Sequence, residues 1–266
     1  MPKPIITLMT DFGTRDAFTG TMKGVILGIL PDACIVDLTH EIFPMNILGG
    51  AFVLKTAYSY FPENTVHICV VDPGVGTSRN PIAIRAHGQY FVGPDNGLFG
   101  YVLHDAPECE CVVIDSRKHC LPGCSSTFHG RDIFAPVGAR IAGGMPLHQI
   151  GAPLENPILP DGLFAEICED CIKGRVIHID HFGNAITNVT RRHISEWRKD
   201  TGMSIFLDGV EIPGPFRTYA DVPPGGPLAL FGSENHLEIS VNKGSAEKQL
   251  GIEIGVQVLV RTAPSR

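Results

Sequence analysis

Two segments of the sequence place an acid or an imidazole close to an arginine. In "VVDPGVGTSR", residues 70–79, an apolar run ends at Asp72, turns through glycines and reaches Arg79. A carboxylate can hold a guanidinium in place, and the guanidinium then presents a permanent positive charge to a bound molecule. In "STFHGRDIFAP", which ends at Pro136, His129 precedes an apolar run typical of a helix. Histidine titrates near neutral pH and often serves as a general acid or base.

These segments have other interpretations. Glycines after a strand resemble a phosphate-binding loop, but residues 70–79 match neither G-x-G-x-x-G nor G-x4-G-K-[ST]. A structural turn with a surface ion pair, worth about 0–1 kcal/mol, is a second possibility. A third segment, "DHFGN", offers Asp180 for an ammonium or hydroxyls, Phe182 for stacking and Asn184 for an adenine edge. A simple hairpin turn would also explain that segment.

A metal site is a competing hypothesis. In a metal-dependent hydrolase, a divalent ion could be held by four side chains of this chain, namely Asp11, Asp72, His129 and Asp132. The H-x-x-D spacing is a weak signal for such a site. The eight cysteines include "CEC", "CLPGC" and "CEDC", whose spacings are not those of common structural zinc sites. We therefore expect thiols, with neither a metal nor a cofactor.

Composition and charge limit the classes of partner. The chain has 266 residues and a formal net charge of −7, which disfavours nucleic acid and anionic membranes because their binding requires clustered lysine and arginine. No stretch approaches the roughly 20 apolar residues of a membrane-spanning helix. The first residues lack the pattern of a secretory signal. A cytoplasmic protein with a small-molecule ligand is the expectation.

The elements that must position these side chains alternate along the first half of the chain. Apolar runs predict strands at residues 5–10, 34–38 and 66–71, with helices at 16–30 and 47–60 between them. Such alternation predicts a mainly parallel sheet with helices on its faces, whose ligands bind beyond the C-terminal ends of the strands. Asp11 and Asp72 both follow such an end. Further strands are expected at 82–85, 90–92 and 111–114, and a helix at 133–142.

The pattern changes after this half. We expect an N-terminal α/β domain at residues 1–150, and a linker rich in proline and glycine at residues 151–170. Residues 171–266 contain short apolar runs separated by turn residues, which favours a smaller, antiparallel, barrel-like β domain. The fold class is therefore α/β with a second, all-β domain.

Six motifs together resemble one family. They are "TDFGTRDAF", "VVDPGVGTSR", "GPDNGLF", "STFHGRDIFAP", "DHFGN" and "GSENHLEISVNKGSA". Their order and spacing, over residues 5–260, are similar to those of the S-adenosyl-L-methionine hydrolases (adenosine-forming), or hydroxide adenosyltransferases, which are relatives of the fluorinases and chlorinases. The resemblance implies conversion of S-adenosyl-L-methionine and water to adenosine and L-methionine. It also implies a homotrimer with active sites between the N-terminal domain of one subunit and the C-terminal domain of the next.

The resemblance also implies a role for each candidate residue. The hydroxide-generating residues are Asp72, Arg79 and His129. The substrate-binding residues are Asp11 for the ribose, Asp180 for the methionine ammonium, Phe182 and Asn184 for the adenine, and Ser233 for the methionine carboxylate. Glu234 stands where the halogenases carry a basic residue, so an anion would lie beside the substrate carboxylate. Its side chain could turn to the ammonium, or its backbone N–H could act instead.

Two alternatives stay open within this resemblance. Halogenase relatives place Tyr and Ser at the positions of His129 and Gly130, and a non-acidic residue at Asp72, so this chain has the residues of the enzymes that use water. An aspartate would also repel halide. A protein that binds S-adenosylmethionine or adenosine without turnover is the non-enzymatic alternative. The sequence leaves open which of the three catalytic candidates takes the proton.

Overall fold

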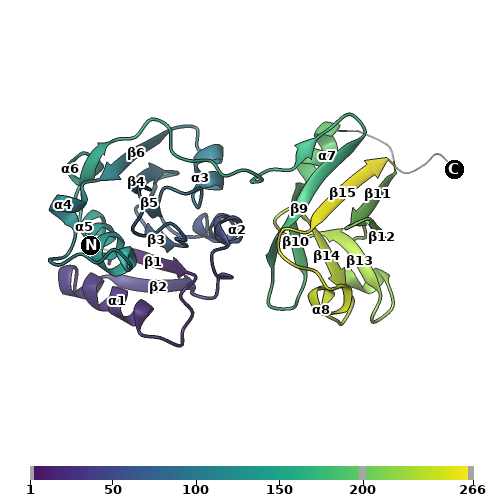
Figure 1. Cartoon of the computed structure of the whole chain (residues 1–266), viewed down its shortest axis with the longest axis horizontal. Helices are drawn as coiled ribbons and strands as arrows, with labels where there is room; N and C mark the ends of the chain where they lie inside the picture. The colour runs from purple at the N-terminus through teal and green to yellow at the C-terminus, as the bar shows by residue number, and fades with distance from the viewer. Residues whose placement is uncertain (1–2, 198–201, 263–266) are drawn as a thin grey trace. The chain divides into compact units, whose positions relative to one another are not determined.

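A computed structural model describes residues 3–197 and 202–262. The chain forms two compact units, Met1–Pro160 and Asp161–Arg266, and the boundary between them lies inside the segment 151–170 (Figure 1). Each unit has its own sheet and its own buried apolar core. The α/β class with a second, antiparallel domain is thus confirmed.

The N-terminal unit is built on a seven-stranded mixed sheet in the order β2-β1-β3-β5-β4-β6-β7. The first four strands in that order, β2, β1, β3 and β5, pair in parallel, as the alternation of strand and helix predicts. By contrast, β4 and β6 run antiparallel to their neighbours in the sheet. The hairpin between β4 and β5 is short, which suits antiparallel pairing. The strands are β1 Ile5–Thr10, β2 Cys34–Thr39, β3 Val66–Val70, β4 Pro81–Ala86, β5 Gln89–Pro94, β6 Cys109–Ile114 and β7 Gly151–Pro153.

Helices cover both faces of this sheet (Figure 1). One apolar cluster joins α1 and α5 to β1 and β3 through Met22, Ile26 and Val137, and a second joins α2 and α3 to the other face through Leu54 and Val102. The two clusters make β1 and β3 central strands, buried from both sides. The helices are α1 Phe18–Ile29, α2 Ile47–Tyr58, α3 Gly100–Asp105, α4 Ser116–His119, α5 Ala135–Ala142 and α6 Leu147–Ile150.

The helix expected at residues 133–142 begins differently from the prediction. Residues Gly130–Phe134 form a π-helical turn, and α5 continues from Ala135. The backbone N–H of Ala135 donates to the carbonyl of Gly130, five residues earlier. The spacing of apolar residues does not reveal such a turn, because a π-helical turn adds one residue while the helix keeps the same buried face. His129 immediately precedes it.

The C-terminal unit holds an antiparallel sheet in the order β12-β11-β15-β9-β10-β14-β13, with β8 paired to β9. Strands across the whole sheet contribute aliphatic side chains to one buried core, for example Val176, Ile205 and Ile239. Its six longer strands correspond to the apolar runs at residues 174–180, 184–189, 203–209, 227–232, 236–241 and 256–260, whereas its two short strands have no such run. The strands are β8 Glu166–Ile167, β9 Cys171–Ile179, β10 Ala185–Thr190, β11 Met203–Leu207, β12 Val210–Ile212, β13 Pro227–Phe231, β14 His236–Val241 and β15 Gln257–Thr262; the helices are α7 Arg191–Trp197, a 3-10 turn Tyr219–Asp221 and α8 Ala246–Leu250.

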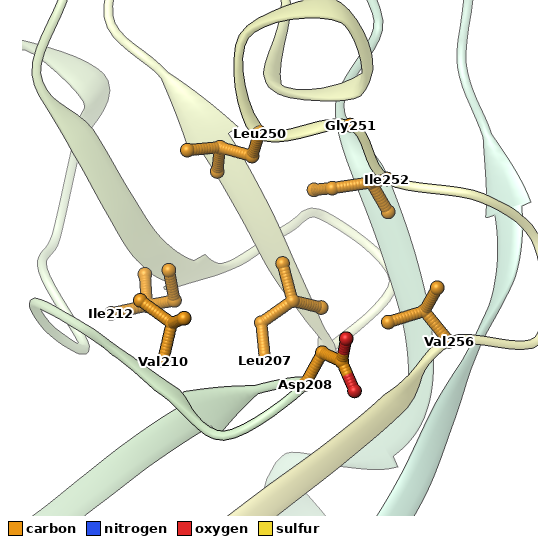
Figure 2. A pocket seen from close by; sticks show the side chains of 8 residues that line it. All are labelled: Leu207, Asp208, Val210, Ile212, Leu250, Gly251, Ile252 and Val256. Carbon is orange, nitrogen blue, oxygen red and sulfur yellow. The ribbon is translucent and has the colours of Figure 1, made fainter.

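A pocket of about 190 Å³ lies between the β11–β12 hairpin and the segment after α8 (Figure 2). Asp208 is the one charged side chain among the eight residues that line it, and the others include Leu207, Val210 and Ile252. None of the candidate site residues lines this pocket. Among the described residues, no helix has both the length and the apolar character needed to cross a membrane.

Candidate active site

Two of the candidate acids lie at the same edge of the N-terminal sheet. Strands β1 and β3 are parallel neighbours, with Thr10 paired to Val70. Asp11 directly follows β1 and Asp72 follows β3 by two residues, so both acids emerge beyond the C-terminal strand ends. The N–H of Asp11 donates to the carbonyl of Val70 (3.4 Å). One Asp11 oxygen, Oδ2, accepts from the N–H of Met45 (2.9 Å), whereas Oδ1 accepts no hydrogen bond from the described residues.

Asp72, Arg79 and His129 form one hydrogen-bonded group. The guanidinium of Arg79 donates from Nε to Asp72 Oδ1 (3.0 Å) and from Nη2 to Asp72 Oδ2. The same Nη2 donates to His129 Nδ1 (2.7 Å). The side chains of Arg79 and Asp72 are only 9% and 4% exposed, so the interpretation as a surface ion pair is wrong. The face of Phe134 lies 5.3 Å from the guanidinium carbon and closes one side of the group.

The loop of residues 71–79 touches the loop that precedes His129. Gly76 has a φ of +76°, and a Cβ added there would lie 2.4 Å from the carbonyl oxygen of Ser126. Only glycine combines that backbone conformation with so close a contact. The glycine thus allows the turn carrying Arg79 to pack directly on the loop that carries His129. Contacts to phosphate are not needed to explain it.

Asp132 holds the loop before His129 rather than joining the three-residue group. Its carboxylate accepts from the backbone N–H of Ser125 (2.7 Å) and from Arg131 Nε (2.6 Å), and Asp132 is 2% exposed. The pKa of Asp132 lies below its usual value, because these hydrogen bonds outweigh desolvation. In the described part of the chain, no three His, Cys, Asp or Glu side chains converge as metal ligands. The four-residue metal hypothesis has no geometric support.

The electrostatics of His129 favour a neutral ring. Partial burial lowers the pKa of His129 below its usual range, and the adjacent charge of Arg79 lowers it further, against opposing effects of Asp72 and Asp132. Since Nδ1 accepts from a permanently protonated guanidinium, the proton of the neutral ring is on Nε2. His129 therefore has its basic nitrogen directed to Arg79.

The segment "DHFGN" forms a tight turn between β9 and β10. Asp180 Oδ1 accepts from the N–H groups of Phe182 and Asn184 (2.9 Å each), and Oδ2 accepts from the Asn184 side-chain amide (2.9 Å). Gly183 has a φ of +82° and lies against Ser245, at the start of α8. Phe182 is 72% exposed and Asn184 is 7% exposed. Two proposed ligand groups, Asp180 and Asn184, thus bind each other.

Ser233 and Glu234 occupy the middle of a second turn, between β13 and β14. The N–H of Asn235 donates to the carbonyl of Gly232 (3.0 Å), which closes the turn. Neither the Ser233 hydroxyl nor the Glu234 carboxylate hydrogen-bonds to another described residue. Both side chains remain available to a ligand, and no described residue neutralises Glu234 in an ion pair.

The sequence did not single out two residues that shape the group of Asp72, Arg79 and His129. Asn96, in the motif "GPDNGLF", donates from its side-chain amide to the carbonyl of Val71 (2.8 Å) and so fixes the backbone next to Asp72. Phe134 covers Arg79. The motif around Asn96 was visible in the sequence, but nothing in the sequence indicated which backbone group its amide would reach.

Comparisons with known proteins show which family this chain resembles. The family model described as the SAM hydroxide adenosyltransferase N-terminal domain matches residues 6–151, and the C-terminal domain model of that family matches residues 174–259. The chain is 41% identical over 258 residues to a protein of Methanocaldococcus jannaschii named (R)-S-adenosyl-L-methionine hydrolase, with 94% of this chain and 92% of that protein covered.

Two further relatives extend the comparison. A fluorinase of an Actinoplanes species is 28% identical over 295 residues, which cover 98% of each chain. The crystal structure of an uncharacterized conserved protein from Thermotoga maritima is similar with a TM-score of 0.85 and 34% identity, over 96% of this chain and 99% of that one.

Proposed function

The chain belongs to the SAM hydroxide adenosyltransferase family, and from that premise we propose that it hydrolyses S-adenosyl-L-methionine to adenosine and L-methionine. The observation that supports this most is the hydrogen-bonded group of Asp72, Arg79 and His129, next to the strand end that carries Asp11. It combines a permanent positive charge, a carboxylate that fixes it and a neutral imidazole.

The reaction requires a strong nucleophile rather than a general acid. A sulfonium sulfur leaves readily as methionine, so no proton has to reach the leaving group. Attack on the ribose 5′ carbon is harder, because free water is a very weak acid and bulk hydroxide is therefore scarce at neutral pH. A guanidinium beside the attacking water stabilises developing hydroxide, and we assign that role to Arg79. Asp72 orients it through two hydrogen bonds.

We assign acceptance or relay of the water proton to His129. Its lowered pKa keeps the ring neutral, as a base must be. Its Nδ1 accepts from Arg79 in this structure, so a water molecule has to enter between the two side chains before that nitrogen can take a proton. In this arrangement water bridges the guanidinium and the imidazole, which places the nucleophile between a charge and a base.

The remaining assignments concern substrate binding. We propose that Asp11 binds the ribose hydroxyls through its available Oδ1, that Phe182 and Asn184 contact the adenine, and that Ser233 binds the methionine carboxylate. Asp180 is proposed for the ammonium, and its present hydrogen bonds to Asn184 would then have to rearrange. We further propose a homotrimer, which sedimentation or light scattering would test.

No cofactor is required by this scheme, and we propose that none is used. A cytoplasmic location is proposed as well, supported by eight cysteines that are all free thiols in the described residues. Full turnover in excess EDTA is the expected result. Loss of activity in EDTA that zinc restores would contradict the proposal.

A chromatographic assay tests the proposed function. Incubation with S-adenosylmethionine is expected to give adenosine and methionine, and oxygen-18 from labelled water is expected at the 5′ position. Addition of chloride should give no 5′-chloro product, because Asp72 places a negative charge where halide would bind. Binding measured by calorimetry without adenosine formation would indicate a sensor instead. Both Asp72→Ala and His129→Ala are expected to lower kcat by roughly a hundredfold or more while changing substrate binding far less.

A further inference from the structure

Two cysteines of the motif "CEDC" lie opposite each other at the closed end of the β8–β9 hairpin, and the proposed hydrolysis does not use them. Ile167 of β8 pairs with Ile172 of β9. The N–H of Cys168 donates to the carbonyl of Cys171 (2.8 Å), so the two cysteines form the next facing pair. Only two residues, Glu169 and Asp170, connect them.

The backbone of this pair has the spacing that a disulfide bond needs. Facing residues of a hydrogen-bonded antiparallel pair have Cα atoms about 5.5 Å apart, and disulfides usually join Cα atoms about 4.4–6.8 Å apart. Side chains of a facing pair project from the same face of the sheet. The two thiols share a hydrogen bond. Cys168 and Cys171 can therefore be joined without a change in strand register.

Two cationic side chains lie on the face of the sheet that carries the thiols. Glu166 pairs with Lys173, two residues along each strand from the cysteines, so alternation places this pair on the same face. The Lys173 ammonium hydrogen-bonds to the Cys168 sulfur, and it lies 3.8 Å from Glu166. Arg261 of β15 pairs with Cys171. Positive charge beside a thiol favours the thiolate, which is the nucleophilic form of cysteine.

The two cysteines differ in their electrostatic surroundings. The pKa of Lys173 is raised first by the negative charge of Cys168, then by Glu166 and by the hydrogen bond to Cys168. The pKa of Cys171 is raised first by desolvation and then by the hydrogen bond and charge of Cys168, against smaller effects of Lys173 and Arg261. Both shifts follow if Cys168 carries the negative charge and Cys171 keeps its proton. Cys168 is then the attacking thiol.

A second pair of thiols lacks these features. Cys120 and Cys124 also share a hydrogen bond, but neither lies in a strand, so no register holds their backbones opposite each other. The pKa of Cys124 is raised by desolvation, then by Cys120 and by the negative charge of Asp132, and Arg131 has the smallest effect. Cys124 is exposed and Cys168 only partly so. Exposure alone would thus favour reaction of the second pair.

We propose that Cys168 and Cys171 are a site of reversible oxidation, at which low-molecular-weight disulfides form an intramolecular disulfide bond. The Cys168 thiolate attacks one sulfur of the small disulfide RSSR; its S–S bond breaks, RS⁻ leaves, and a mixed disulfide remains on Cys168. Cys171 then loses its proton to solvent and attacks the Cys168 sulfur, and the second RS⁻ leaves. The protein loses two electrons, and RSSR is reduced to two thiols. This inference does not depend on the proposed hydrolysis.

Peptide mapping of the wild-type protein tests the proposal. The reduced, native protein is incubated at pH 7 with bis(2-hydroxyethyl) disulfide, whose neutral charge excludes electrostatic attraction of the oxidant. Free thiols are alkylated with N-ethylmaleimide at intervals, and peptides are identified by mass spectrometry. The disulfide between Cys168 and Cys171 is expected to form before Cys120 or Cys124 reacts, and dithiothreitol should reverse it. A hairpin that stays reduced, or that reacts no faster than the second pair, would overturn the proposal.

Single variants identify the attacking thiol. Cys171→Ser should accumulate a mixed disulfide on Cys168, because no second thiol can close the bond. Cys168→Ser should accumulate much less mixed disulfide on Cys171 in the same time. Equal accumulation in the two variants would refute the role of Cys168. The mapping of wild-type protein needs no variant, so a variant that does not fold leaves a decisive measurement.

Lys173→Met tests the contribution of the ammonium. In the Cys171→Ser background, this change is expected to slow formation of the mixed disulfide about two- to fivefold, the range of an exposed ion pair. Lys248→Met is the matched control, since it makes the same charge change in α8, which begins beside Gly183 at the other end of β9 from Cys171. Its rate should equal that of the background. An equal rate for all three proteins, or equal slowing by both changes, would refute the role of Lys173.

Discussion

The ion pair between Asp72 and Arg79 can be tested through stability as well as through turnover. In Asp72→Asn, an amide NH2 group replaces one carboxylate oxygen. This group donates hydrogen bonds and cannot accept one from Arg79, so two donors face each other. Of the two hydrogen bonds from Arg79 to Asp72, at least one must be lost. Because the Arg79 side chain is 9% exposed, its charge remains buried without a counterion.

The expected magnitude follows from that burial. Removing one partner of a buried pair typically lowers the free energy of unfolding by about 3–5 kcal/mol, against about 0–1 kcal/mol for a pair in water. Urea unfolding of Asp72→Asn, followed by circular dichroism, should show a loss in the first range. The double variant Asp72→Asn/Arg79→Gln removes the charge as well and should recover part of the stability.

Activity should not follow stability in this series. The double variant lacks the guanidinium, so its kcat is expected to stay roughly a hundredfold or more below that of the wild type, even though it unfolds less readily than the single variant. A loss below about 1 kcal/mol in Asp72→Asn would refute the reasoning, because the pair would then behave as solvated. Recovery of turnover in the double variant would refute the role of Arg79.

Three further predictions concern titration and packing. NMR titration of the His129 ring should give a pKa below about 6.5, since burial and then the Arg79 charge lower it, and a higher pKa in Arg79→Met. Burial lowers the pKa of His67 to about 4, below its value in the unfolded chain. The neutral ring therefore contributes about 3 kcal/mol to the free energy of unfolding above about pH 6.5, and this contribution is lost as the pH falls toward 4. In urea unfolding, His67→Gln should show a weaker dependence of stability on pH. Gly76→Ala should destabilise by about 1–3 kcal/mol because its Cβ would meet the facing loop, whereas Gly28→Ala, in a helix with open space around it, should be neutral or stabilising by about 0.5–1 kcal/mol in thermal unfolding.

The early strands and helices could be predicted because local patterns and the fold agree there. Residues 5–10 were expected as a strand and form β1 with the same bounds, and the first two helices end within two residues of their predicted ends. A parallel arrangement of these strands followed from their alternation with helices. The antiparallel β4 and β6 could not be inferred, because strand direction depends on which neighbours pair.

The candidate site was partly predictable for a related reason. Asp11 and Asp72 follow apolar runs, so their place at a sheet edge can be derived from the sequence. The contact of Arg79 with His129 joins residues fifty positions apart, and the resemblance to a family, rather than any local pattern, brought them together.

The π-helical turn after His129 contains one residue more than an α-helical turn that rotates the chain by about the same amount. Deleting one residue from Gly130–Phe134 would therefore convert the turn to α-helix, while His129 and α5 keep their faces. The side chains inside the turn would move instead, and they include Asp132, which holds the loop before His129, and Phe134, which covers Arg79. A chain shortened here would keep Asp72, Arg79 and His129 and lose the side chains that support them.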